Sequence, residues 1–258
     1  MTVLAIISIV GTICGILYCV VSLLCTVSFA LRHRDKAGMP FAPPVSILKP
    51  LCGLDPHAYA SLRSHCTQDY PAFEIIFGVA DPADEILPTV EKVRAEFPDV
   101  PVKLVHCPQS LGTNLKISNL VQMLPHARHE LLLINDSDIQ VPSDYLRRVL
   151  APLKNRSVGM VTCLYRGAAA ESIGSKLESL GISSDFIPGV LTANRFDGGL
   201  RFGLGSTLAF SRKALDAAGG FIPLTDYLAD DYQLGYRISQ AGLKVELADC
   251  VVDHYLPP

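Results

Sequence analysis

Two aspartates, Asp136 and Asp138, directly follow an apolar run at residues 131–134. A short apolar run bounded by polar residues is typical of a strand that is buried on both faces. Ligands of open α/β sheets bind outside the carboxyl ends of the strands, so we expect both carboxylates at a binding edge. Mg²⁺ and Mn²⁺ favour carboxylates and usually bind one or two of them together with substrate phosphates. The spacing therefore indicates a metal that holds a diphosphate, with an ordinary turn as the alternative.

Other polar residues stand where predicted elements begin or end. Asp81 follows an apolar stretch at 73–79, and Asp230 and Asp231 open a helical stretch that runs to about residue 240. Asp81 is also placed to cap the next helix, and neighbouring acids at a helix start both interact favourably with the helix dipole. The residue types alone leave a chemical and a purely structural interpretation open.

The elements that must position these residues alternate along the chain. Strands are predicted at 45–48, 73–79, 102–106, 131–134 and 158–164, with a further apolar piece at 207–210. Helices are predicted at 56–65 with Asp55 as the N-cap, and at 82–97, 115–124, 172–180 and 229–240. This alternation predicts an α/β domain over residues 37–258, with a mainly parallel sheet and helices on both faces.

The N-terminus predicts a membrane anchor over residues 1–36. No charged residue occurs from Val3 to Ala30, and a helix of that length exceeds the roughly 30 Å hydrocarbon core of a bilayer. A signal peptide would carry a basic start and a shorter apolar run. Arg32, Arg34 and Lys36 follow the apolar stretch, so the positive-inside rule predicts a single-pass protein with a cytoplasmic catalytic domain.

Composition excludes several classes of function. The net charge is −3 and no basic stripe lies outside the juxtamembrane cluster, so we expect no nucleic-acid partner. The eight cysteines have no C-x-x-C spacing, which argues against structural zinc or a disulfide framework. Small molecules and lipid are the expected partners.

Several ordered motifs together resemble a known family. The chain is similar to the GT-A glycosyltransferases and, more closely, to the ceramide glucosyltransferase family, over about residues 44–254. The matching segments are Val45-Ser46-Ile47-Leu48-Lys49-Pro50-Leu51-Cys52-Gly53, Asp81, Gly112-Thr113-Asn114-Leu115-Lys116-Ile117-Ser118-Asn119-Leu120, Asp136-Ser137-Asp138 and Ala229-Asp230-Asp231-Tyr232.

The resemblance implies an inverting, metal-dependent transfer of a hexose from a UDP-sugar to a membrane lipid hydroxyl. The metal would be Mn²⁺ or Mg²⁺, and its implied ligands are Asp138, Asp136 and His254. The implied donor-binding residues are Lys49, Asp81, Lys116 and Asp136. Asp231 is similar to the family's catalytic base and Asp230 is expected to cap the helix, although the two roles could be reversed.

The resemblance has one departure and leaves alternatives open. Family members continue into a Gln-x-x-Arg-Trp motif, whereas this chain ends at Pro258 and contains no tryptophan. We therefore expect nucleotide binding with little transfer from the chain as it stands. The alternatives are a hopanoid-associated glycosyltransferase that uses a UDP-N-acetylhexosamine, an inactive truncated membrane protein that keeps the fold, and a nucleotidyltransferase. The last would need a glycine-rich basic loop after the first strand, and residues 49–53 contain one glycine and one base.

Overall fold

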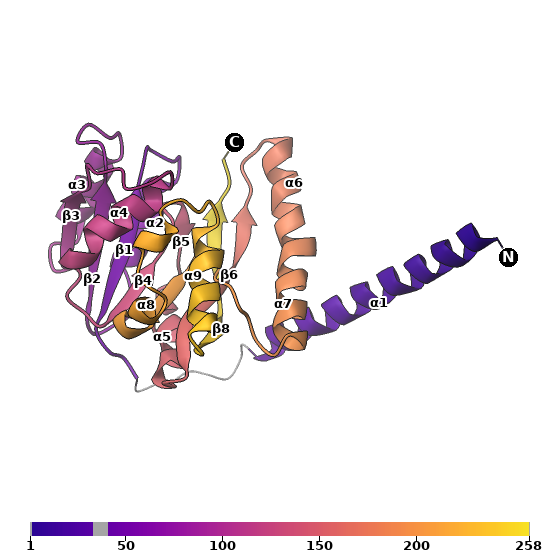
Figure 1. Ribbon diagram of the computed structural model, residues 1–258. Helices are drawn as coiled ribbons and strands as arrows, with labels where there is room; N and C mark the ends of the chain where they lie inside the picture. The colour runs from indigo at the N-terminus through magenta and orange to yellow at the C-terminus, as the bar shows by residue number, and fades with distance from the viewer. Residues whose placement is uncertain (1, 33–40, 258) are drawn as a thin grey trace.

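A computed structural model describes residues 2–32 and 41–257 (Figure 1). One eight-stranded sheet, ordered β3-β2-β1-β4-β7-β6-β8-β5, organises the domain. Its strands are β1 (Val45–Leu51), β2 (Phe73–Val79), β3 (Val102–His106), β4 (Leu131–Ile134), β5 (Ile139–Gln140), β6 (Val158–Ala168), β7 (Leu208–Ser211) and β8 (Lys244–Tyr255). The longer helices are α1 (Val3–Arg32), α2 (Ala58–Cys66), α3 (Leu87–Glu96), α4 (Leu115–Met123), α5 (Tyr145–Leu150), α6 (Ile173–Gly181), α7 (Ile187–Phe196), α8 (Arg212–Ala217) and α9 (Asp230–Gln240).

The predicted α/β architecture is confirmed, and the parallel order holds in one half of the sheet. Strands β3, β2, β1 and β4 are parallel, and every residue of β1 and β4 is buried. In the other half, β7 runs antiparallel to both β4 and β6, β8 runs parallel to β6, and β5 pairs antiparallel with β8. The sheet as a whole is therefore mixed.

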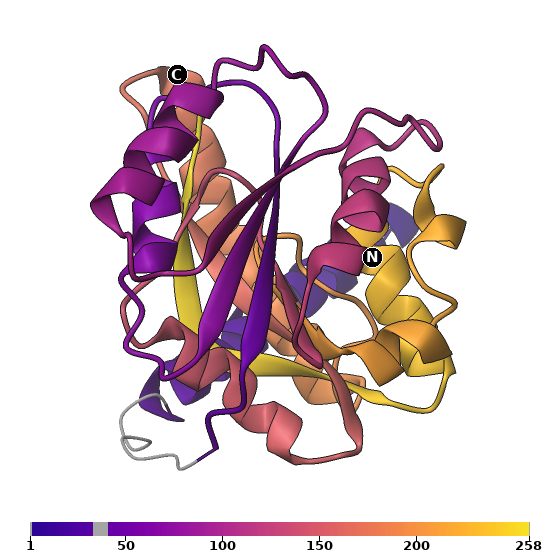
Figure 2. The ribbon, with the colours of Figure 1, turned by 90° about the vertical axis from the view of Figure 1, so that its left-hand side faces the viewer.

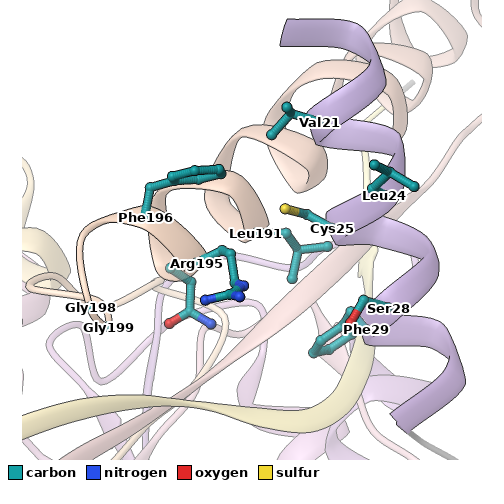
Figure 3. Close-up of a pocket in the computed structure, with 11 residues that line it drawn as sticks. Val21, Leu24, Cys25, Ser28, Phe29, Leu191, Arg195, Phe196, Gly198 and Gly199 are labelled. Carbon is teal, nitrogen blue, oxygen red and sulfur yellow. The ribbon is translucent and has the colours of Figure 1, made fainter. Parts of the chain in front are cut away.

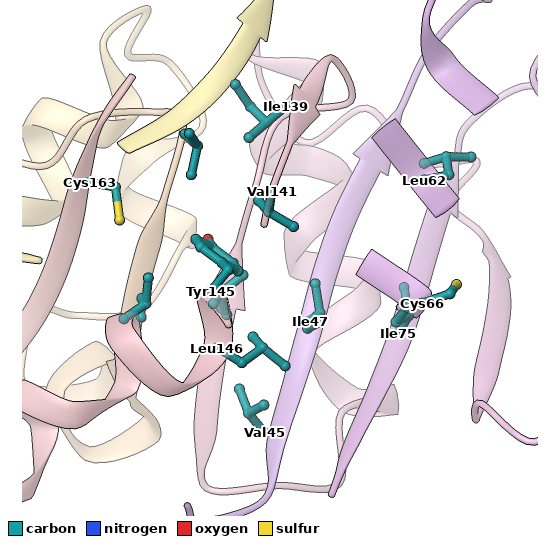
Figure 4. Packing of buried hydrophobic residues seen from close by; sticks show 14 of the residues in the cluster. Val45, Ile47, Leu62, Cys66, Ile75, Ile139, Val141, Tyr145, Leu146 and Cys163 are labelled. Carbon is teal, nitrogen blue, oxygen red and sulfur yellow. The ribbon is translucent and has the colours of Figure 1, made fainter. Parts of the chain in front are cut away.

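Helices cover both faces of this sheet, as predicted. Figure 2 shows α2 and α3 on one face and α4, α8 and α9 on the other. Two apolar clusters match these layers. The cluster on the α2 side includes Ile47, Leu62 and Ile75 and surrounds the buried Tyr145 of α5 (Figure 4). The second cluster lies beneath α4, α7, α8 and α9. Burial on both faces explains why the central strands are nearly continuous apolar runs.

Two helices, α3 and α2, begin later than the sequence predicts, and in both the aspartates before them make other contacts. Helix α3 starts at Leu87, since the carboxylate of Asp81 accepts from Ala83 N at 2.8 Å and that of Asp84 accepts from Ile86 N at 3.0 Å. Helix α2 starts at Ala58, and Asp55 is not its side-chain cap. The Asp55 carboxylate instead accepts from Ser137 Oγ at 3.1 Å, which ties this loop to the Asp-x-Asp segment.

Helix α1 is the one described helix long and apolar enough to cross a membrane, over Val3–Leu31. Its C-terminal part packs against α7, where Ser22 Oγ and Thr192 Oγ1 lie 3.1 Å apart. The rest projects away from the domain (Figure 1). The predicted basic flank lies at residues whose side chains are outside the described part of the chain, so the orientation of this helix stays a prediction.

Helices α6 and α7 are joined by a π-helical segment, η3 (Ile182–Phe186), so that residues 173–196 form one uninterrupted helical rod. The sequence predicts its first turns only. The rod lies along the side of the domain from which α1 projects (Figure 1).

Candidate active site

The Asp-x-Asp loop is positioned by a buried polar network beneath it. Asn135, fully buried, donates from Nδ2 to Tyr145 Oη at 2.8 Å and to the backbone oxygen of Ser206 at 2.6 Å. Its Oδ1 lies 3.2 Å from Nε2 of the buried His65. Because buried polar groups are costly unless they are hydrogen bonded, this satisfied network fixes the end of β4 and hence the loop that follows.

Lys49 holds the same loop from β1. Its side chain is fully buried, and its Nζ donates to the backbone oxygen of Asp136 at 2.7 Å. Burial lowers the pKa of Lys49 to about 7, against the opposing charges of Asp138 and Asp136. The direct contact with a donor that the resemblance implies stays a prediction. The bond to Asp136 gives Lys49 a positioning role that its sequence position does not reveal.

Lys116 joins two acidic segments that are distant in sequence. Its Nζ lies 2.6 Å from Asp136 Oδ1 and 3.4 Å from Asp230 Oδ2. Burial opposes the charge on Lys116, but Asp136 and Asp230 outweigh it and hold its pKa above the ordinary value. Asn114 caps α4 by accepting from Ile117 N at 3.0 Å, and its Nδ2 donates to Asp230 Oδ1 at 3.2 Å. The first turn of α4 therefore holds the start of α9.

Asp138 and His254 form the opposite side of the site. Nε2 of His254 lies 2.9 Å from Oδ2 of Asp138, and the pairing of β5 with β8 sets His254 beside Ile139. The hydrogen bond with Asp138 raises the pKa of His254. Burial raises the pKa of the Asp138 carboxyl, but the hydrogen bond and charge of His254, together with Lys49, outweigh this and lower it.

The Asp138 pair fits a hard divalent cation. The second oxygen of Asp138, Oδ1, is buried and has no hydrogen-bond partner, which is an acceptor left for a ligand. No cluster of three or more His, Cys, Asp or Glu side chains close enough to bind a metal occurs within residues 2–32 and 41–257. Mg²⁺ and Mn²⁺ are commonly held by one or two protein ligands with phosphate oxygens completing the shell, so the unpartnered oxygen of Asp138 fits the chemistry of such a site.

Asp231 is positioned by a glycine-rich loop packed against α9. A Cβ on Gly235 of α9 would lie 2.3 Å from Gly203 N, and Gly203 N donates to the backbone oxygen of Asp231 at 3.3 Å. A Cβ on Gly205 would lie 3.0 Å from Asp136 Oδ2 and 3.2 Å from Asp231 Oδ2. Gly205 thus packs against both carboxylates, and a side chain at this position would crowd them. The glycines allow this close approach within the protein.

Burial raises the pKa of the Asp231 carboxyl, and the charge of Asp230 raises it further. The Asp231 Oδ1 accepts from Tyr232 N at 2.7 Å. The expected helix cap at Asp230 is wrong, because Ala229 is the N-cap residue and the Asp230 carboxylate binds Lys116 and Asn114 instead. The two neighbours therefore differ: Asp230 is engaged by a cation, whereas Asp231 faces Gly205 and Asp136.

Asp81 stands apart from these contacts. It lies beyond the end of β2, is exposed, and its carboxylate accepts from Ala83 N in the turn before α3. The neighbouring Asp84 accepts from Gly53 N with both carboxylate oxygens at 3.0 Å, which ties the loop after β1 to the loop after β2. The uridine contact of Asp81 stays a prediction.

Sequence reasoning brought together Asp136, Asp138, Lys116, Asp231 and His254 but gave no role to several residues that position them. These are Asn135, Asn114, Gly205 and Gly235. Asn114 and Asn135 lie within or beside the quoted motifs, so a search for buried amides next to the acids would have found them. Gly205 lies in the glycine-rich stretch 198–206, which predicts either close backbone approach to a ligand or a plain loop. Which segments approach the glycines depends on packing between distant parts of the chain.

The fold of this mixed sheet with helices on both faces is that of a GT-A glycosyltransferase. Solved structures support this fold. The Pyrobaculum calidifontis mannosyltransferase PcManGT, solved with GDP-Man and Mn²⁺, superimposes with a TM-score of 0.68 at 22% identity, over 93% of this chain and 69% of that one. GalNAc-T7, solved with UDP, GalNAc and Mn²⁺, gives a TM-score of 0.61 at 14% identity, over 84% of this chain and 44% of that one.

Within that class, the chain belongs to glycosyl transferase family 21, whose model matches residues 6–257. Curated relatives include ceramide glucosyltransferases 3 and 1 of Caenorhabditis elegans. They are 28% and 25% identical to it, over 94% and 85% of this chain. The matches cover 52% and 47% of those proteins, so the chain spans about half the length of these relatives.

Proposed function

We propose that this domain transfers a hexose from a UDP-sugar to the hydroxyl of a membrane lipid, with inversion and with a divalent metal. Glucose and ceramide are the proposed donor sugar and acceptor, since the curated relatives are ceramide glucosyltransferases. The observation that carries the proposal is the placing of Asp231 opposite Asp136 across Gly205. It sets an acid with a raised pKa beside the segment proposed to hold the diphosphate.

The donor side of the proposal rests on the loop after β4. Asp138, Asp136 and His254 would hold Mn²⁺ or Mg²⁺, which neutralises charge on the departing diphosphate when it is bound. Lys49 fixes the loop through the Asp136 backbone, and Lys116 supplies a cation beside Asp136. Asp81 is proposed to accept a hydrogen bond from the uracil or ribose, as carboxylates at this edge of nucleotide-binding sheets do.

The acceptor side rests on Asp231. An inverting transfer requires the attacking hydroxyl to lose its proton to a base on the face opposite the leaving group. Burial raises the Asp231 pKa toward the range in which a carboxylate accepts a proton efficiently. Asp230 is a poorer candidate, because its carboxylate is held by Lys116 and Asn114. The proposed lipid acceptor agrees with an N-terminal helix able to span a bilayer.

Calorimetry on the detergent-solubilised chain tests the donor and the metal together. We expect UDP and UDP-glucose to bind more tightly with Mn²⁺ than with chelator, and more tightly than GDP-mannose. Asp138→Asn should abolish the increase in UDP affinity that Mn²⁺ causes, because the amide offers only one neutral oxygen. Asp81→Ala is the matched comparison and should weaken UDP binding both with and without metal. An Asp138→Asn protein that keeps the full Mn²⁺ effect would disprove the metal assignment.

A further inference from the structure

The outer side of α6 carries a stripe of exposed apolar side chains. Ile173, Leu177 and Leu180 are 77%, 63% and 61% exposed. Their spacing of four and three residues sets them on one face of the helix. Ser175 and Ile182 are buried on the other side, against the domain. Three large apolar residues in line and open to solvent mark a contact surface, whereas single ones would need no explanation.

The helical rod of residues 173–196 is held rigidly in place. Ser179 Oγ donates to the backbone oxygen of Gly167 in β6 at 2.7 Å, and Val190 and Leu191 are buried in the second apolar cluster. At the far end, the rod meets α1. A cavity of about 660 Å³ lies between α1 and α7, lined by apolar residues such as Val21 and Leu191 and by the polar Asn194 and Arg195 (Figure 3). Helix α1 therefore contacts the rod at α7, through Ser22 and Thr192 beside this cavity.

This geometry determines what faces the stripe. Helix α1 projects from the same side of the domain along which α6 and α7 lie (Figure 1). If α1 crosses a bilayer, the rod lies along the adjacent membrane surface. Lys176 is exposed and borders the stripe, so the helix presents an apolar face next to a positive charge, as helices that lie in the membrane interface do.

We propose that α6 is a membrane-interface helix, with Ile173, Leu177 and Leu180 inserted at the boundary between lipid headgroups and acyl chains. The occupant of this surface is the lipid bilayer itself. The inference goes beyond the proposed chemistry and depends only on α1 spanning the bilayer.

The insertion has a consequence for the candidate site. Phe186 of the rod packs on Tyr165 of β6 with ring centroids 5.1 Å apart, and Tyr165 contacts His254 edge to face at 5.5 Å. Two ring contacts thus connect the membrane-facing rod to the Asp138 and His254 pair. A rod seated on the bilayer is thereby linked through packed side chains to the candidate site.

Tryptophan fluorescence tests the proposal directly, because the chain contains no tryptophan. The full chain carrying Leu177→Trp is reconstituted in phosphatidylcholine vesicles with a quencher attached near the headgroup or near the acyl-chain end. Insertion by about 5–10 Å predicts stronger quenching by the shallow quencher. Ile173→Trp gives an independent reading from the same stripe, should Leu177→Trp fold poorly.

Two matched variants separate the possible outcomes. Leu17→Trp, in the middle of α1, should be quenched best by the deep quencher. Ala95→Trp, on α3 at the other end of the domain, should be unquenched.

If Leu17→Trp is quenched while both α6 variants emit like Ala95→Trp, the interface helix is disproved although α1 inserts. A blue-shifted but unquenched α6 tryptophan would show that protein covers the stripe, which also overturns the proposal. The fluorescence measurement needs no donor or metal. Its result therefore does not depend on whether the proposed sugar transfer is correct.

Discussion

Lys116 Nζ and Asp136 Oδ1 lie 2.6 Å apart, and this ion pair joins the first turn of α4 to the loop after β4. The same ammonium lies 3.4 Å from Asp230 at the start of α9. One cation therefore offsets part of the repulsion between two carboxylates. Of the four acids Asp136, Asp138, Asp230 and Asp231, the described ion pairs give a lysine partner to Asp136 and Asp230.

Lys116→Met should destabilise the metal-free protein. The variant leaves Asp136 and Asp230 as neighbouring carboxylates without their cation, and a lost hydrogen bond to a charged group costs about 1–3 kcal/mol. Chemical denaturation followed by circular dichroism, with chelator present, measures this. Lys116→Arg keeps the charge and should recover most of the stability. A Lys116→Met protein as stable as the parent would show that the two acids do not need this cation.

Asp231→Asn should reduce sugar transfer to lipid by about 10²–10⁴-fold, the usual contribution of general-base catalysis. The amide keeps the shape of the side chain but cannot take the proton, so UDP-sugar binding should change little. Transfer is measured with radiolabelled donor in the protein that carries this domain. Asp230→Asn is the comparison. Should Asp230→Asn lose transfer and Asp231→Asn keep it, the base is the other neighbour.

Gly205→Ala should impair turnover while the fold survives. The new methyl group would lie 3.0 Å from Asp136 Oδ2 and 3.2 Å from Asp231 Oδ2, so both carboxylates must give by a few tenths of an ångström. A misplacement of about 1 Å can cost about 10²-fold in rate, so this smaller shift should lower the rate by less than that. Transfer assays and thermal denaturation together distinguish this from unfolding. Gly174→Ala is the matched control, because its Cβ has no neighbour within 4 Å. Equal activity of the two variants would contradict the conclusion that Gly205 must lack a side chain to leave room for Asp136 and Asp231.

The pair of His254 and Asp138 should stabilise the metal-free protein only within a pH window. The folded pKa of His254 is raised above 6.5, so its contribution is complete below that value and is lost as the pH rises through the raised pKa. The folded pKa of Asp138 is lowered below 3.8, so its contribution is lost as the pH falls through that lowered pKa. Melting temperatures of the parent and His254→Gln, measured with chelator, should converge once the pH exceeds the raised pKa of His254. A constant difference up to high pH would argue against the ion pair.

Local pattern determined much of this fold. Strands β2, β3 and β4 have the predicted bounds, because strands buried on both faces need unbroken apolar runs that the sequence displays directly. Helices α4, α6 and α9 begin within two residues of their predicted starts for a similar reason, since caps and apolar spacing are local. The order of acids along the chain likewise predicted that Asp136 and Asp231 lie near each other, whereas Asp81 lies apart from them.

Only the tertiary structure decided which partners each of those residues contacts. Strand β8 and its pairing with β5 bring His254 to Asp138, and no local pattern predicts a pairing between segments so distant in sequence. The difference between Asp230 and Asp231 arises from Lys116, which reaches the first and not the second by direct contact. The exposed stripe of α6 is apolar at helical spacing and its pattern alone predicts a buried face, so only the packed domain shows that it points outward. Burial and pairing are properties of which segments meet, and that depends on the whole chain folding together.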